Sequence, residues 1–104
     1  MQYTSNNHTD NSSSVARCTF VGVTSITFSC YSYGEGCCDY LTVGNLDRTC
    51  QRGTGKTTVK NTTTDITYTC DAGGHYVEFC YSKDGSVSIS PDEAIVYIKS
   101  VTLA

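Results

Sequence analysis

Polar and apolar residues alternate along most of the chain after residue 14. Between Cys18 and Cys30, β-branched and aromatic residues recur with a period of two, so this segment is expected to hold one or two strands, with Gly22 as the point of division. A turn at residues 44–45 and a hairpin turn at residues 72–75 follow from their Gly and Asn content. Further strands are expected over residues 39–43, 57–61, 65–70, 75–81 and 94–103.

The same pattern predicts the fold class. No window of eleven residues carries a helical apolar stripe, and short strands with Gly and Asn turns are typical of an antiparallel β-sandwich. A chain of 104 residues has room for one core. Residues 1–14 are almost wholly polar, so we expect a flexible N-terminal segment there and the sandwich domain over residues 15–104.

Charge excludes some function classes. The net charge is −3, and the seven Lys and Arg residues are scattered, which argues against a nucleic-acid groove. No apolar run approaches the ~20 residues that span a bilayer, so no membrane insertion is expected. The first fifteen residues lack the apolar region of a secretion signal, so export would follow signal removal or use another route.

Seven cysteines are many for a cytosolic domain of this size. Zinc sites use short paired spacings that this chain lacks, so disulfides formed in an oxidising compartment are the prediction. An odd number leaves one thiol free or bonded to a neighbouring chain. The expected pairings are Cys70 with Cys80 across a hairpin centred on His75, Cys37 or Cys38 with Cys50, and Cys18 with Cys30.

Other motifs carry weaker chemical signals. The tripeptides at Asn7, Asn11 and Asn61 match the N-glycosylation pattern, although they also arise by chance in a chain rich in Asn, Ser and Thr.

Carboxylate pairs raise the question of catalysis. Glu35 with Asp39, or Asp84 with Asp92, could serve as the acid and base of a glycosidase, but solvated loop acids are the simpler interpretation. Neither histidine has an evident nucleophile and carboxylate around it, so we predict a protein without catalytic residues.

Two segments resemble a known family. Residues 26–43 resemble the CUB-type pattern of an apolar strand, an acidic residue, a cysteine and then Asp-Tyr-apolar-x-Val. Residues 77–88, followed by residues 96–98, resemble that family's strand, Ser-x-Asp loop and closing strand. Both halves also look like a module of bacterial and bacteriophage surface proteins, with Glu-x-x-x-Asp-Tyr, Gly-x-Leu-Asp and Tyr-x-Lys-Asp-Gly-Ser-Val. The resemblance covers about two-thirds of the chain.

The resemblance implies a jelly-roll sandwich that works outside cells in binding or assembly, with calcium as cofactor. Calcium takes six to eight oxygen ligands. Lys83 precedes one of the acids, and its ammonium could replace the ion by pairing with the carboxylates. The alternative to calcium is a metal-free network in which Asp39 and Asp84 cap N–H groups of the loops. The implied ligands are the carboxylates of Glu35, Asp39 and Asp84 and the carbonyls of Ser86 and Val87.

These observations favour an extracellular or virion-surface module that acts in structural assembly or adhesion. Its expected partners are protein subunits of a larger assembly, and the N-terminal segment or an unpaired cysteine could join two copies of the chain. The alternative is a carbohydrate-binding module for cell-surface glycans, with sugars stacked on tyrosine rings. The candidate rings are Tyr31, Tyr33, Tyr40 and Tyr81.

Overall fold

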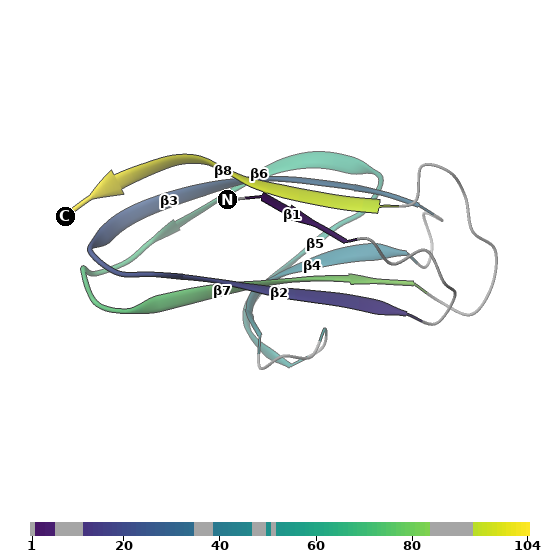
Figure 1. The fold of residues 1–104 in the computed structure, drawn as a ribbon, viewed down its shortest axis with the longest axis horizontal. Coiled ribbons are helices and arrows are strands. Elements are labelled where there is room, and N and C mark those ends of the chain that lie inside the picture. Colours follow the sequence, from purple (N-terminus) through teal and green to yellow (C-terminus); the bar gives the residue numbers. More distant parts are fainter. Residues whose placement is uncertain (1, 6–11, 35–38, 47–49, 51, 84–92) are drawn as a thin grey trace.

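The computed structural model describes residues 2–5, 12–34, 39–46, 50, 52–83 and 93–104. Within those ranges the chain forms strands and no helix (Figure 1). The strands are β1 (Gln2–Thr4), β2 (Ser13–Phe20), β3 (Val23–Tyr33), β4 (Tyr40–Leu46), β5 (Gly53–Val59), β6 (Thr62–Thr69), β7 (His75–Ser82) and β8 (Glu93–Leu103).

Two antiparallel four-stranded sheets pack face to face. The first has the strand order β1-β8-β3-β6 and the second β2-β7-β4-β5, and Figure 1 shows them as two layers. The predicted all-β sandwich is therefore confirmed. No helix long and apolar enough to cross a membrane occurs in the described part of the chain.

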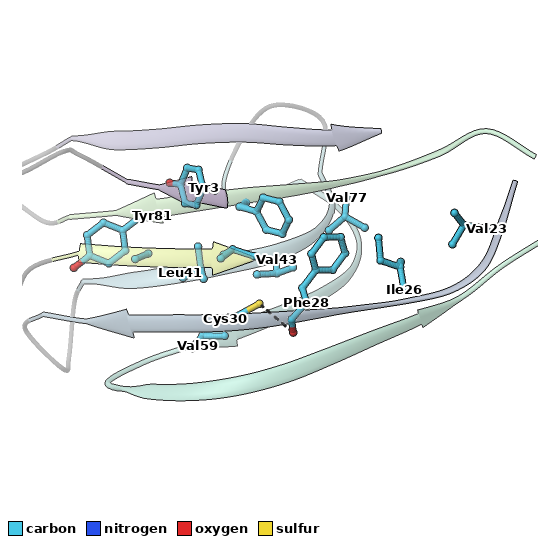
Figure 2. Packing of buried hydrophobic residues seen from close by; sticks show 13 residues of the cluster. Tyr3, Val23, Ile26, Phe28, Cys30, Leu41, Val43, Val59, Val77 and Tyr81 are labelled. Carbon is cyan, nitrogen blue, oxygen red and sulfur yellow. Dashed lines mark hydrogen bonds between the residues drawn. The ribbon is translucent and has the colours of Figure 1, made fainter. Parts of the chain in front are cut away.

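Alternation along the strands builds the core. On β3, Ile26 and Phe28 point between the sheets (Figure 2), and Phe79 of β7 belongs to the same buried cluster. The rings of Phe28 and Phe79 meet edge to face with centroids 5.2 Å apart. Because successive strand residues point to opposite faces, the intervening residues lie on the outer faces of the sheets.

The N-terminal segment differs from its prediction. Residues 2–4 form β1 beside β8, and Tyr3 is buried against Phe79 with ring centroids 5.8 Å apart. The Tyr3 hydroxyl donates a hydrogen bond to the Ser14 carbonyl at 2.9 Å, which ties β1 to the second sheet. The expectation that all of residues 1–14 lie outside the core is wrong here, because one buried aromatic is enough to anchor a short polar strand. Residues 6–11 lie outside the described residues.

Strand divisions were partly predicted. The segment from Cys18 to Cys30 does divide at Gly22, whose φ of +73° suits glycine, and its two halves enter different sheets. The predicted turn at residues 44–45 is wrong, because β4 continues to Leu46 through a bulge. A Cβ at Gly44 would lie 3.0 Å from the carbonyl oxygens of two β5 residues, so glycine here permits close approach of β5.

The predicted hairpin around His75 is also wrong. β6 pairs with β3 in the first sheet, whereas β7 pairs with β2 and β4 in the second. The connection at residues 70–74 therefore crosses between the sheets instead of joining paired strands (Figure 1). A Gly-Gly turn specifies a chain reversal, but whether the flanking strands pair depends on the partners each of them finds elsewhere.

Candidate functional site

The last strand has one side that is only partly covered. β8 pairs with β3 along almost its whole length, from Glu93 to Leu103. On the opposite side, β1 pairs only with Ile95, Val96 and Tyr97. Among the described residues, none pairs with this side of β8 beyond Tyr97, and Figure 1 shows β8 continuing past β1 to the C-terminus. We call residues 98–103 on this side the open β8 edge.

Apolar side chains are exposed along the open β8 edge. Val101 is 43 % exposed and Leu103 is 74 % exposed. The turn that precedes β3 carries Val21, which is 72 % exposed, and the Ala104 N–H donates to the Gly22 carbonyl at 3.0 Å beside it. Three exposed apolar residues thus gather at the end of the sandwich where no described residue pairs with one side of β8.

A lysine on β8 does not shield this edge. Charged side chains, lysine above all, commonly protect edge strands against pairing with other chains. The Lys99 ammonium lies 2.5 Å from the Asp65 carboxylate on β6. Since β6 and β1 lie on opposite sides of β8, Lys99 reaches across β3 and away from the open edge. The hydrogen bond to Asp65 raises the pKa of Lys99.

The edge strands β2, β5 and β6 expose other kinds of residue than the open β8 edge does. β2, β5 and β6 each carry a charged residue in mid-strand, namely Arg17, Lys56 and Asp65. Their exposed positions are otherwise mostly Ser, Thr and Gly. On these three strands Val15 of β2, at 44 %, is the one large apolar side chain that is exposed, whereas the open β8 edge has two, Val101 and Leu103.

Asp39 occupies a buried ion pair at the opposite end of the sandwich. Asp39 directly precedes β4 and Lys83 directly follows β7, and these strands pair so that Tyr40 faces Ser82. The Lys83 ammonium lies 3.5 Å from an Asp39 carboxylate oxygen, and both side chains are 1 % exposed. The predicted pairing of Lys83 with a carboxylate is thus confirmed for Asp39.

The calcium prediction depends mainly on other residues. Within the described ranges, no three His, Cys, Asp or Glu side chains gather into a group that could hold a metal ion. Asp39 is the one implied ligand that can be located, so calcium binding stays a prediction. The remaining implied ligands, Glu35, Asp84, Ser86 and Val87, lie outside the described residues.

Gly34 packs closely against Asp39 and Tyr81. A Cβ at Gly34 would lie 2.9 Å from the Asp39 Cβ and 2.5 Å from the Tyr81 hydroxyl. The Gly34 N–H donates to the Asn61 side-chain oxygen at 3.1 Å, and Asn61 adopts a φ of +47° in the short link between β5 and β6. The Asn61 residue is exposed, which is compatible with glycosylation, and its glycosylation stays a prediction. The other two acceptors, Asn7 and Asn11, lie outside the described residues.

The four candidate tyrosines do not form one sugar platform. Tyr81 is fully buried and donates its hydroxyl to the Tyr33 carbonyl at 2.8 Å, so its prediction as an exposed stacking ring is wrong. Tyr31 and Tyr33 lie on the outer face of β3 with ring centroids 4.8 Å apart. Tyr40 belongs to the other sheet, where the Lys60 ammonium lies 5.0 Å over its ring. Alternation on two different sheets separates these rings.

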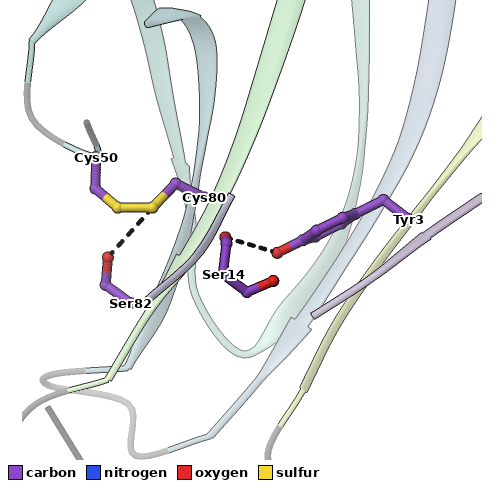
Figure 3. The surroundings of a disulfide bond; sticks show 5 residues. All are labelled: Tyr3, Ser14, Cys50, Cys80 and Ser82. Atoms are coloured by element: carbon purple, nitrogen blue, oxygen red, sulfur yellow. Dashed lines mark hydrogen bonds between the residues drawn. A yellow bond between two sulfur atoms is a disulfide. The ribbon is translucent and has the colours of Figure 1, made fainter. Parts of the chain in front are cut away.

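One disulfide joins the link between β4 and β5 to β7. Cys50 and Cys80 are bonded, with Cα atoms 5.5 Å apart, and the Ser82 hydroxyl lies 3.8 Å from the Cys80 sulfur (Figure 3). The predicted pairings of Cys80 with Cys70 and of Cys50 with Cys37 or Cys38 are therefore wrong. Cys70 directly follows β6 of the first sheet, and its thiol donates to the Val23 carbonyl at 3.1 Å.

The predicted pairing of Cys18 with Cys30 is wrong as well, because both are free thiols. They lie four and eight residues from the turn at Gly22, a stagger of about 13 Å at the usual rise of a strand. Burial raises the pKa of Cys30 to about 12, so its thiol is inert. Cys37 and Cys38 lie outside the described residues.

A buried acid escaped the sequence analysis. Glu78 is 1 % exposed on the outer face of β7, and the Arg17 guanidinium lies 2.6 Å from its carboxylate and 4.0 Å from the centre of the Tyr76 ring. The sequence does hold one indication of this buried acid, because Glu78 lies within the apolar run of residues 77–81. The outer face of the second sheet is therefore polar and partly covered.

His75 has a carboxylate partner that the sequence did not reveal. Its ring Nε2 lies 2.9 Å from the Asp71 carboxylate, which also accepts the Gly73 N–H at 2.8 Å. That backbone hydrogen bond, together with His75, lowers the pKa of Asp71. The same ring nitrogen also lies 3.2 Å from the Asp71 carbonyl oxygen, so both contacts hold His75 against the turn at residues 71–74.

The chain was compared with protein-family models, with curated proteins and with solved structures, and none of the three comparisons gives a match. The CUB-type resemblance therefore stays a prediction.

Proposed function

We propose that this chain is a non-enzymatic module of an extracellular or virion surface that acts in structural assembly or adhesion. The observation that carries the proposal is the open β8 edge, where backbone groups and the exposed side chains of Val101 and Leu103 are available to a further strand. Addition of a strand to a sheet edge is a common mode of protein association, because main-chain hydrogen bonds supply affinity and alternate side chains supply specificity.

The partner that fits this edge is the β8 strand of a second copy. Two antiparallel β8 strands related by a two-fold axis present the same apolar residues to each other, as isologous interfaces do. Residues 98–103 provide about 20 Å of paired strand. Lys99 adds little repulsion, because its charge is balanced by Asp65 within the same copy. Such pairing would join two four-stranded sheets into one continuous sheet.

The cysteine chemistry supports a location outside the reducing cytosol. The bond between Cys50 and Cys80 needs an oxidising compartment to persist. A thin sandwich with a small apolar core gains a large share of its stability from such a bond. Both points agree with secretion or display on a surface.

Sedimentation velocity over a range of protein concentrations tests the proposal. We expect the wild type to shift from monomer to dimer as the concentration rises, and Leu103→Lys to remain monomeric, because a charge at the edge opposes strand pairing. Thr63→Lys is the matched control, since it adds the same charge at an exposed site on β6, and it should dimerise like the wild type. A wild type that stays monomeric throughout, or a Leu103→Lys variant that still dimerises, would overturn the proposal.

A further inference from the structure

Residues 2–5 lie against one part of β8 and are held there by both backbone and side-chain contacts. β1 pairs antiparallel with residues 95–97. The contact continues one residue further, because the Ser5 N–H donates to the Ala94 carbonyl and the Ala94 N–H donates to the Ser5 hydroxyl, both at 3.0 Å. Tyr3 and Ser5 are 6 % and 4 % exposed, so alternate side chains of the segment are buried. A strand bound here is therefore recognised by two side chains that are two positions apart.

The Tyr3 ring lies in a slot that fits a tyrosine. It stacks on the Phe79 ring of β7, with centroids 5.8 Å apart and an angle of 27° between the ring planes. Its hydroxyl reaches the second sheet and donates to the Ser14 carbonyl of β2 at 2.9 Å (Figure 3). A phenylalanine at this position would lose that hydrogen bond, and an alanine would leave a cavity. We call residues 94–97, Phe79 and Ser14 together the β1 site.

β1 is held by fewer contacts than the strands that form the core. It has three residues, whereas β3 and β8 have eleven each and pair with each other along almost their whole length. β1 is also the outermost strand of its sheet in the described part of the chain. Short segments at the edge of a fold open at a lower free energy than core strands do. Detachment of β1 would therefore leave the pairing of β8 with β3 in place and the β1 site empty.

We propose that the β1 site binds residues 2–5 of a second copy, so that two chains exchange their first strands. An exchanged strand makes the same contacts in the second copy as in its own chain, so exchange costs little free energy and increases with protein concentration. The sequence supports a specific match, because Tyr3 is the only one of the eight tyrosines that is followed two residues later by serine. This inference rests on the proposed role in assembly, but it uses residues 94–97 of β8 instead of the open β8 edge.

The first test measures the binding of a labelled synthetic peptide with the sequence of residues 1–6 to the full-length Tyr3→Ala chain by fluorescence anisotropy. Circular dichroism shows that the variant is folded, and its own first strand lacks the side chain that anchors it. We expect saturable binding, at least tenfold weaker binding of the same peptide carrying Tyr3→Ala, and at least tenfold weaker binding of the original peptide to the wild-type chain. Equal affinity for the two peptides, or no binding to the folded variant, would overturn the proposal.

Cross-linking tests exchange between full chains whose Tyr3 anchor is intact. Gln2 and Tyr97 are exposed partners in the strand register, so a Gln2→Cys chain mixed with a Tyr97→Cys chain forms a disulfide between positions 2 and 97 only when strands are exchanged. Both chains also carry Leu103→Lys, which blocks the open β8 edge and separates this test from that of the proposed function. We expect peptide mapping after oxidation to show this link, and no link when Thr63→Cys on β6 replaces Tyr97→Cys. Absence of the link between positions 2 and 97 in concentrated mixtures, or equal linking to position 63, would overturn the proposal.

Discussion

Removal of the bond between Cys50 and Cys80 should destabilise the fold strongly. The two cysteines are 30 residues apart in the sequence, and closing a loop of that length lowers the entropy of the unfolded chain enough to stabilise the folded state by about 3.6 kcal/mol. For a chain of 104 residues the unfolding entropy is roughly 0.22 kcal/mol/K. The double variant Cys50→Ala/Cys80→Ala should therefore unfold about 16 °C below the wild type.

Thermal unfolding followed by circular dichroism measures this loss. The wild type in excess reductant should show a similar decrease, because reduction opens the loop by converting the disulfide into two thiols and substitutes no residue. Cys70→Ala is the control, since Cys70 is a free thiol and its variant should respond to reductant as the wild type does. A decrease in the double variant corresponding to less than about 1 kcal/mol would refute the loop-entropy argument. So would a wild type whose midpoint does not respond to reductant.

Three further predictions concern buried polar groups. Lys83→Met removes the ammonium that faces the buried Asp39 carboxylate, so urea denaturation should show a free energy of unfolding lowered by about 3 to 5 kcal/mol. Millimolar calcium should restore part of this loss in the variant by binding to the Asp39 carboxylate. If calcium stabilised the wild type equally, ligation by Asp39 would be contradicted. Tyr68→Phe removes a buried hydroxyl that has no hydrogen-bond partner among the described residues, so the free energy of unfolding should rise by about 1 kcal/mol, and a fall would contradict the reasoning. Burial raises the pKa of Cys30 and of Tyr68 to about 12 in the folded chain. The unfolded chain therefore releases these protons at lower pH, and the free energy of unfolding should fall as the pH rises from 9 towards 12. A urea midpoint that stays constant over that range would disprove this.

The class of fold was predictable because alternation is a local property of the chain. Ile26 and Phe28 point inward and Thr27 outward for the same reason that their spacing predicts a strand, and no other part of the molecule is needed to see it. Gly22 was likewise readable as a division between strands. Lys83 could be proposed as the partner of a carboxylate because it stands next to an acidic segment in the sequence.

Pairing across long stretches of sequence was not predictable. Cys80 bonds to Cys50, and not to Cys70, because β6 and β7 lie in different sheets, and that assignment depends on the partners of every other strand. The bulge at Gly44 depends in the same way on the approach of β5. A period of two specifies which face each residue takes, but it carries no information about which strand lies beside it.

The candidate sites follow the same division. Val101, Leu103 and Thr42 are ordinary strand residues in the sequence, and nothing local distinguishes them from their neighbours. Among the described residues, β1 pairs with three of the eleven residues of β8, which leaves the open β8 edge. Thr42 and Cys50, which are far apart in the sequence, line one cavity because Cys50 is bonded to Cys80 on β7, the strand next to Thr42. Side-chain pattern selects strands and a core, whereas exposed edges and cavities arise from how strands of unequal length are placed together.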